Sequence, residues 1–337
     1  MQRKLYSFLK HGATLIVPPM KRTLGFAAMV SVLTNAPVAL AQSGGAQAAL
    51  VAQDLRLAAV SQRLMQANDA LCRRHMPLTG LVLHTRDQYP SDPGSAFANG
   101  PVAIEAVLPG SPAAAAILAG DAIVAIDGTP VAGLQRQGAA PLRDTVFELL
   151  ADQPVDRPVA ITLVRQGVER TASLAVPSGC RALVEVRAGG GHNARSDGRV
   201  VQIDQGLAAQ ASDEQLAVIF AHELAHAVLE HRRRLDAAGV SKGFFGEFGK
   251  NQQLNRTVEV EADRLSVHLL ANAGYDPKIA PAFWRSPLGR RSGGLSAVYP
   301  TPEARAQLLE REIADYLGAG LAPSWPGHLL GKRDRPF

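Results

Sequence analysis

Two histidines four positions apart, His222 and His226, lie in the middle of a segment whose pattern predicts an α-helix. Ser212 and Gln215 are spaced as in a helix-capping box, and apolar residues follow them at helical intervals. Four residues make just over one helical turn, so both imidazoles project from one face, about 6 Å apart along the axis. Bare imidazoles among apolar neighbours are costly, which indicates that they bind something.

The five residues 222–226 read H-E-L-A-H, so a carboxylate stands beside the first histidine. This arrangement predicts one Zn²⁺ per chain, bound by both imidazoles. Glu223 is then the general base that takes a proton from metal-bound water. The plain alternative is a solvated polar face on an ordinary helix, because H-E-x-x-H also occurs by chance.

A third ligand is expected from a second helical pattern further along the chain. His231 is rejected, because five residues past His226 is about 140° around the helix. Glu259 and Asp263 are four apart and share a face, while Glu261 points elsewhere. We predict Glu259 as the ligand and Asp263 as the carboxylate that orients a ligand histidine. The alternative is that these acids only cap a helix.

The H-E-L-A-H segment, followed by E-V-E-A-D at 259–263, resembles the signature of gluzincin metallopeptidase family forty-eight. That family includes the CAAX prenyl endopeptidases, HtpX and BepA, and the resemblance runs from about residue 182 to 317. It implies an α+β fold with a mainly helical zincin-type domain and a small edge sheet. It also implies that Glu259 binds zinc and that the strand near His192–Val201 offers its edge to an extended substrate.

One departure from the family pattern concerns the catalytic residues. The family usually carries a His-Pro pair followed by an arginine, and here Tyr299 stands in place of the histidine while Arg305 is kept in register. We predict both as catalytic residues. The Tyr299 hydroxyl could donate a hydrogen bond to a developing oxyanion. Equally, it could only pack against its neighbours.

The segment before the zinc motif resembles a bacterial PDZ domain, a small β-barrel or sandwich. G-S-P-A-A at 110–114 and G-D-A-I-V-A-I-D-G at 120–128 carry this resemblance. PDZ domains bind an extended peptide by adding it as a strand at a sheet edge. The turn Thr79-Gly80-Leu81 is predicted to bind the peptide carboxylate, with a plain loop entering a strand as the alternative.

The N-terminal segment 1–41 has the pattern of a signal peptide. A basic pair at Lys21–Arg22 precedes an apolar run at Leu24–Leu33 and an A-L-A cleavage site at 39–41. We therefore expect a periplasmic or secreted protein cleaved after Ala41, with Met20 as an alternative start. The interruption after residue 33 argues against a transmembrane helix in the mature chain.

The charge balance argues against nucleic acid as a partner. The chain has 35 basic and 30 acidic residues, and the five basic residues before position 42 belong to the expected signal peptide. The mature chain is then neutral, with 30 of each sign. The glycine- and phenylalanine-rich segment 243–249 leaves peripheral membrane contact open, with a packed loop as the alternative.

The two cysteines, Cys72 and Cys180, bracket the PDZ-like segment and predict a disulfide in an oxidising compartment. The predicted organisation follows: an N-terminal helix at 42–76 that packs on the catalytic domain, a PDZ domain at 77–179, a metallopeptidase domain at 180–320 and a solvated C-terminal tail at 321–337.

These patterns together predict an exported zinc metalloendopeptidase that cleaves protein substrates, in envelope protein quality control or processing, with the PDZ domain recognising them. A non-catalytic PDZ-based scaffold with a relic peptidase domain is the alternative of a different class. A zinc hydrolase of non-peptide bonds is the third.

Overall fold

The computed structural model describes residues 36–89, 97–196, 200–240, 249–292, 300–318 and 323–337. The predicted signal segment up to residue 35, the glycine-rich segment 241–248 and the predicted catalytic residue Tyr299 lie outside these ranges. Residues Gln42–Phe337 form one compact unit. Among the described helices, none combines the length and the apolar character needed to cross a membrane.

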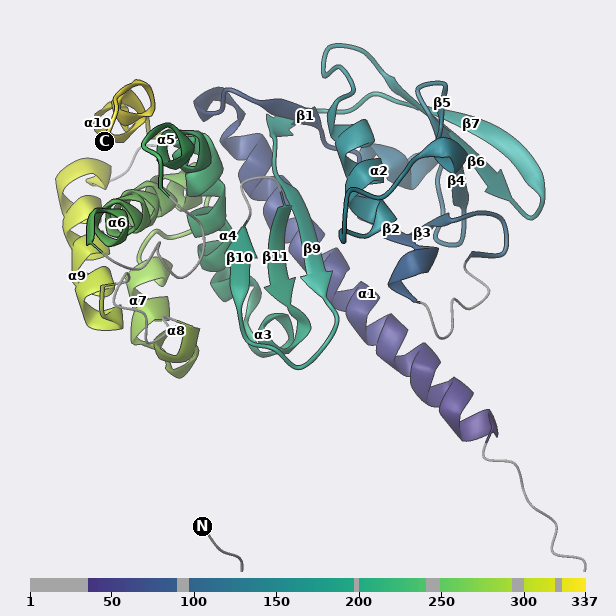
Figure 1. The fold of residues 1–337 in the computed structure, drawn as a ribbon, viewed down its shortest axis with the longest axis horizontal. Helices are drawn as coiled ribbons and strands as arrows, with labels where there is room; N and C mark the ends of the chain where they lie inside the picture. The colour runs from purple at the N-terminus through teal and green to yellow at the C-terminus, as the bar shows by residue number, and fades with distance from the viewer. Residues whose placement is uncertain (1–35, 90–96, 197–199, 241–248, 293–299, 319–322) are drawn as a thin grey trace, which may run out of the picture. The chain divides into compact units, whose positions relative to one another are not determined.

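The chain begins with a long helix, continues with a mainly β part and ends with a mainly helical part (Figure 1). The helices are α1 (Ala36–Ala67), α2 (Leu142–Ala151), α3 (Gln205–Gln210), α4 (Asp213–Val228), α5 (His231–Ala237), α6 (Gly249–Asn272), α7 (Ile279–Arg285), α8 (Pro287–Ser292), α9 (Pro302–Glu312) and α10 (Gly327–Leu330). The strands are β1 (His75–Pro77), β2 (Leu81–Thr85), β3 (Val102–Val107), β4 (Ala122–Ile126), β5 (Thr129–Pro130), β6 (Val159–Arg165), β7 (Val168–Leu174), β8 (Ser178–Cys180), β9 (Leu183–Arg187), β10 (Ala194–Ser196) and β11 (Val200–Asp204).

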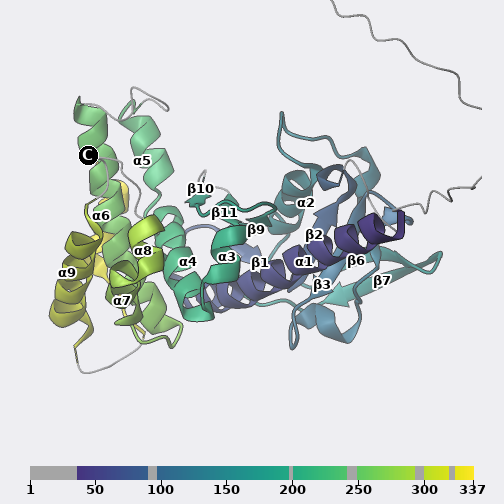
Figure 2. The ribbon, with the colours of Figure 1, turned by 90° about the horizontal axis from the view of Figure 1, so that it is seen from below.

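The helix expected at 42–76 corresponds to α1, which begins earlier than predicted, at Ala36 before the proposed cleavage site, and also ends earlier, at Ala67. The Asn68 side chain donates to the carbonyls of Leu64, in α1, and Leu269, in α6, which fastens the end of α1 to a second helix. Buried apolar residues of α1 belong to the same core cluster as those of α4 and α6, so the helix packs on the helical part as expected. Figure 2 shows α1 running beside α3 and α4.

The PDZ-like part is built on an antiparallel sheet in the order β2-β3-β4-β6-β7, with β5 paired to β4. In β6, Val159, Ile161 and Leu163 are buried while the residues between them are not, the period-2 pattern of a strand with one core face. Helix α2 begins at Leu142, directly after Pro141, and contributes Val146 and Leu150 to the same core.

A buried carboxylate in α1 connects this helix to both parts of the chain. The buried Asp54 carboxylate of α1 contacts His84 Nε2 in β2 at 3.0 Å and accepts a hydrogen bond from the Val186 N–H in β9 at 2.7 Å. His84 Nδ1 lies 2.5 Å from the Tyr89 hydroxyl. A carboxylate buried without such partners would be destabilising, so these contacts fix α1 against the two sheets.

The helical part carries a three-stranded sheet in the order β10-β11-β9, with β10 antiparallel and β9 parallel to β11. Helix α4 starts at the predicted capping box, where the Ser212 hydroxyl accepts from the Gln215 N–H. The rejection of His231 treats this helix as continuous past His226, and that expectation is wrong. The helix stops at Val228, because Glu230 adopts a left-handed conformation with φ 52°, and α5 begins at His231.

The expectation of a solvated tail at the C-terminus holds only in part. Leu329 and Leu330 in α10 are buried, and the Lys332 ammonium lies 3.1 Å from Glu261 Oε1. The chain is exposed from Asp334 onward, although the Phe337 ring still lies 4.2 Å from the Arg234 guanidinium carbon.

The predicted disulfide joins Cys72 to Cys180, with their Cα atoms 5.4 Å apart. The bond closes a loop of 108 residues that contains the whole PDZ-like sheet. In the chain-entropy model a loop of this size stabilises the fold by about 4–5 kcal/mol.

Replacing both cysteines by serine should therefore lower the free energy of unfolding by about 4 kcal/mol. Urea unfolding of the oxidised chain and of the double variant measures this difference. The reduced wild-type chain is the control and should match the variant. Equal unfolding midpoints for oxidised and reduced chains would contradict the expectation.

Candidate metal centre

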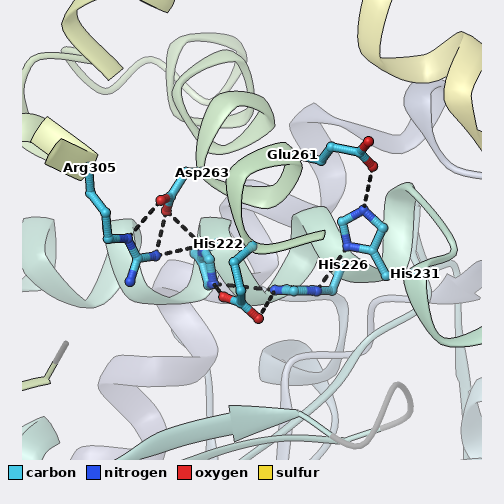
Figure 3. Close-up of polar contacts among 7 residues, drawn as sticks. His222, His226, His231, Glu261, Asp263 and Arg305 are labelled. Carbon is cyan, nitrogen blue, oxygen red and sulfur yellow. Dashed lines mark hydrogen bonds and ion pairs between the residues drawn. The ribbon is translucent and has the colours of Figure 1, made fainter. Parts of the chain in front are cut away.

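The two histidines of α4, His222 and His226 (Figure 3), converge on one point with Glu259 of α6. His222 Nε2 lies 3.1 Å from Glu259 Oε2 and 3.3 Å from His226 Nε2. His226 Nε2 lies 3.7 Å from Glu259 Oε1. The three ligand atoms lie within 4.8 Å of one another, which is close enough for all of them to contact a single ion.

The hydrogen bonds of His222 determine which of its nitrogens faces the centre. Its Nδ1 lies 3.0 Å from the Asp263 carboxylate, which can only accept, so Nδ1 carries the proton and donates. The Nε2 atom is left facing Glu259 and His226. Asp263 thus has the orienting contact that the sequence predicts for it, and Glu261 lies elsewhere, as the helical spacing indicates.

The electrostatics of the three groups suit a cation. Burial opposes a charge on His222, but its hydrogen bonds to Asp263 and Glu259 outweigh burial and raise its pKa to about 10. Burial lowers the pKa of His226 to about 3, so this imidazole keeps a free lone pair. Burial also opposes the charge of Glu259, yet the two histidines lower its pKa to about 2. The Nε2 atom of His222 therefore carries positive charge, as a proton or as a bound metal ion. The donor set of two imidazoles and one carboxylate fits zinc.

Glu223, next to His222 on α4, is partly buried, and its carboxyl interacts electrostatically with His222 and Glu259. Burial raises the pKa of its carboxyl to about 7. A carboxyl with a pKa near neutrality can both accept and return a proton at physiological pH, which is the property a general base needs.

Arg305 of α9 reaches the centre through Asp263. Its Nε donates to Asp263 Oδ2 at 2.7 Å, and its Nη2 donates to Oδ1 at 2.5 Å. The guanidinium is buried and lies 3.5 Å from the centre of the Trp284 ring, a contact that the sequence did not indicate. Arg305, predicted as a catalytic residue, is therefore placed where it holds Asp263 and, through it, His222.

His231 is absent from the set of three ligand atoms, as predicted, but it does not lie apart from the site. Its Nδ1 lies 2.9 Å from His226 Nδ1, and its Nε2 lies 3.2 Å from Glu261 Oε2. The prediction had placed His231 on a distant face of one continuous helix. The turn at Glu230 brings it back beside His226.

A second group of possible ligands, His268, Glu312 and His328, joins α6, α9 and α10. Glu312 Oε1 is shared by both imidazoles, at 3.1 and 2.7 Å, and Oε2 accepts from Arg264 at 2.5 Å. Burial opposes the charge of Glu312, but its contacts with His268, Arg264 and His328 lower its pKa to about 2. Because both oxygens of Glu312 already have partners, we interpret His268, Glu312 and His328 as part of an ion pair network that joins α6, α9 and α10.

The predicted peptide-binding turn lines a cavity of about 80 Å³. Gly80 has φ +78°, and a Cβ there would lie 2.2 Å from Ser111 Cβ, so only glycine fits. Phe147 and Leu150 of α2 line the same cavity, and residues of α1 and β9 complete its wall.

The low pKa of Glu312 predicts an acid dependence of stability. Its folded pKa lies below the ordinary value, so its contribution is present above about pH 4.5 and is lost as the pH falls towards 2. Between pH 5 and pH 2, wild type should lose about 3 kcal/mol more unfolding free energy than Glu312→Gln. Glu310→Gln, a change at an exposed ion pair on the same helix, is the matched control and should follow the wild-type pH dependence. Parallel curves for Glu312→Gln and wild type would contradict the assignment.

Two segments of the chain match models of known families. Residues 83–142 match the PDZ domain, and residues 190–245 match Peptidase family M48. The second match contains His222, Glu223 and His226 and ends before Glu259.

The chain is also similar to a curated protein, the mitochondrial metalloendopeptidase OMA1 of Arabidopsis thaliana. The two are 30% identical over 122 residues, which cover 29% of this chain and 24% of that relative. The matched part is thus about a quarter of the relative's length. The resemblances to metallopeptidase family forty-eight and to PDZ domains are confirmed. The chain thus contains a segment that matches the PDZ domain and, after it, a segment that matches Peptidase family M48.

Proposed function

We propose that this protein is a zinc-dependent metalloendopeptidase that cleaves protein substrates. The convergence of His222, His226 and Glu259, with the Glu223 carboxyl beside them, is the observation that carries the proposal. One zinc ion held by these three side chains would polarise a peptide carbonyl and lower the pKa of water at its open position.

The chain's own residues supply the proton transfers of peptide hydrolysis. Glu223, with a pKa near 7, takes a proton from the attacking water and later gives it to the leaving amine. Asp263 accepts from His222 Nδ1 and keeps Nε2 directed at the centre, and Arg305 holds Asp263 in place. Extended substrate would align along β10, the edge strand of the small sheet, which contacts α4.

The PDZ domain is proposed to recognise the substrate. The turn Thr79-Gly80-Leu81 and the apolar side chains of α2 border a cavity, and we propose that this cavity takes the end of a peptide. Its small volume suits one small terminal side chain. We also propose export, with cleavage after Ala41 and action in the cell envelope, because the Cys72–Cys180 disulfide needs an oxidising compartment.

Replacing Glu223 by glutamine tests the proposed chemistry. The amide cannot accept the proton of water, while the three ligands are untouched, so cleavage of unfolded casein should fall by at least about 10²-fold with zinc content unchanged. A peptide-cleavage assay and metal analysis on the same sample measure both. A chelator should abolish wild-type activity. Full activity in Glu223→Gln, or in chelator, would contradict the proposed mechanism, whereas a wild-type chain that cleaves no casein would favour the scaffold function.

Gly80→Ala tests recognition by the PDZ domain. The added methyl meets Ser111 and distorts the turn, so KM for a protein substrate should rise while cleavage of a short peptide is unchanged. Gly110→Ala is the matched control, because Gly110 also has a positive φ, of 75°, but no atom within 4 Å of its new Cβ. Equal effects of the two variants would show that the groove takes no part in cleavage.

A further inference from the structure

The second metal-facing histidine, His226, has its own supporting group, and the proton positions identify it. For Nε2 of His226 to face the centre with a lone pair, its proton must be on Nδ1. That atom lies 2.9 Å from His231 Nδ1, which must therefore accept. The proton of His231 is then on Nε2, which lies 3.2 Å from Glu261 Oε2 and donates to it. Each ring nitrogen of His226 and His231 is thus either a donor or an acceptor, and no two donors or two acceptors face each other.

The residues behind His231 are buried and fixed. His231 and Glu261 are 1% and 3% exposed, so water does not compete for their hydrogen bonds. Arg234 of α5 donates to Glu261 Oε2 at 2.6 Å, and Lys332 donates to Oε1 at 3.1 Å. Glu261 is therefore held on both oxygens.

Lys332 belongs to the C-terminal segment, which contacts α6 at Glu261. Arg333 in the same segment donates to the Leu71 carbonyl at 2.8 Å, and its own carbonyl accepts from Arg233 at 2.7 Å. The last part of the chain is thus connected to a candidate metal ligand by an unbroken series of polar contacts, from Lys332 through Glu261 and His231 to His226.

We propose that His231 is the positioning residue of His226, supported by Glu261 and Lys332. It does for His226 what Asp263 and Arg305 do for His222 (Figure 3). The two histidines differ in one respect, since His222 donates to a charged acceptor and His226 donates to a neutral one. This assignment rests on the proposed zinc centre. It gives the C-terminal segment a part in fixing the orientation of His226.

The experiment compares two buried histidines in the complete chain. His231→Phe removes the acceptor and keeps an aromatic ring. His268→Phe is the matched control, because His268 is equally buried and also pairs with a glutamate, Glu312, that accepts from an arginine. The zinc dissociation constant is measured by competition with a chromogenic chelator, and urea unfolding of the metal-free chains reports stability. His231→Phe should weaken zinc binding about 10- to 100-fold. His268→Phe should leave it within about twofold, although both variants lose stability.

Two further variants keep the inference testable if His231→Phe does not fold. His231→Gln offers an amide oxygen as acceptor and should recover part of the zinc affinity. Lys332→Met removes only the outermost contact and should weaken zinc binding a few-fold with little change in unfolding. Wild-type affinity in both His231→Phe and Lys332→Met, or an equal loss in His268→Phe, would overturn the assignment. A wild-type chain that binds no zinc would instead overturn the proposed metal centre itself.

Discussion

The packing of α4 against α6 is the contact on which the candidate centre depends. Leu224 of α4 and Leu265 of α6 are fully buried in one apolar cluster, and this packing fixes the rotation of each helix about its axis. The polar face of α4 then meets Glu259 and Asp263. Buried charges are costly unless paired, and here each carboxylate has an imidazole or guanidinium partner. The apolar core thus determines where the charged side chains meet, and their pairing offsets the cost of burying them.

The two parts of the chain are joined by polar contacts that are themselves buried. Asp54 of α1 binds β2 and β9 together, and Arg143 of α2 forms an ion pair with Glu185 of β9. Glu185 also accepts from Gln202 of β11, the strand next to β10, along which we propose that substrate aligns. The PDZ-like part and the small sheet are therefore joined by fixed, buried contacts.

Local spacing predicted those features of the site that lie within one helix. The capping box placed α4, and the i, i+4 rule put His222 with His226 and Glu259 with Asp263, away from Glu261. The role of His231 was missed, because it depends on a left-handed turn at Glu230 that no local pattern predicts for glutamate. Trp284 was missed because its contact with Arg305 joins two helices. The C-terminal contacts depend on tertiary packing in the same way.

The most direct measurement is a zinc titration of the metal-free wild-type chain, followed by its cleavage of unfolded casein. The account predicts that activity rises from zero in proportion to added zinc and levels off at one ion per chain, because we propose one centre at His222, His226 and Glu259 and interpret the cluster around Glu312 as an ion pair network. Activity that is present before zinc is added, or that does not follow zinc occupancy, would contradict it.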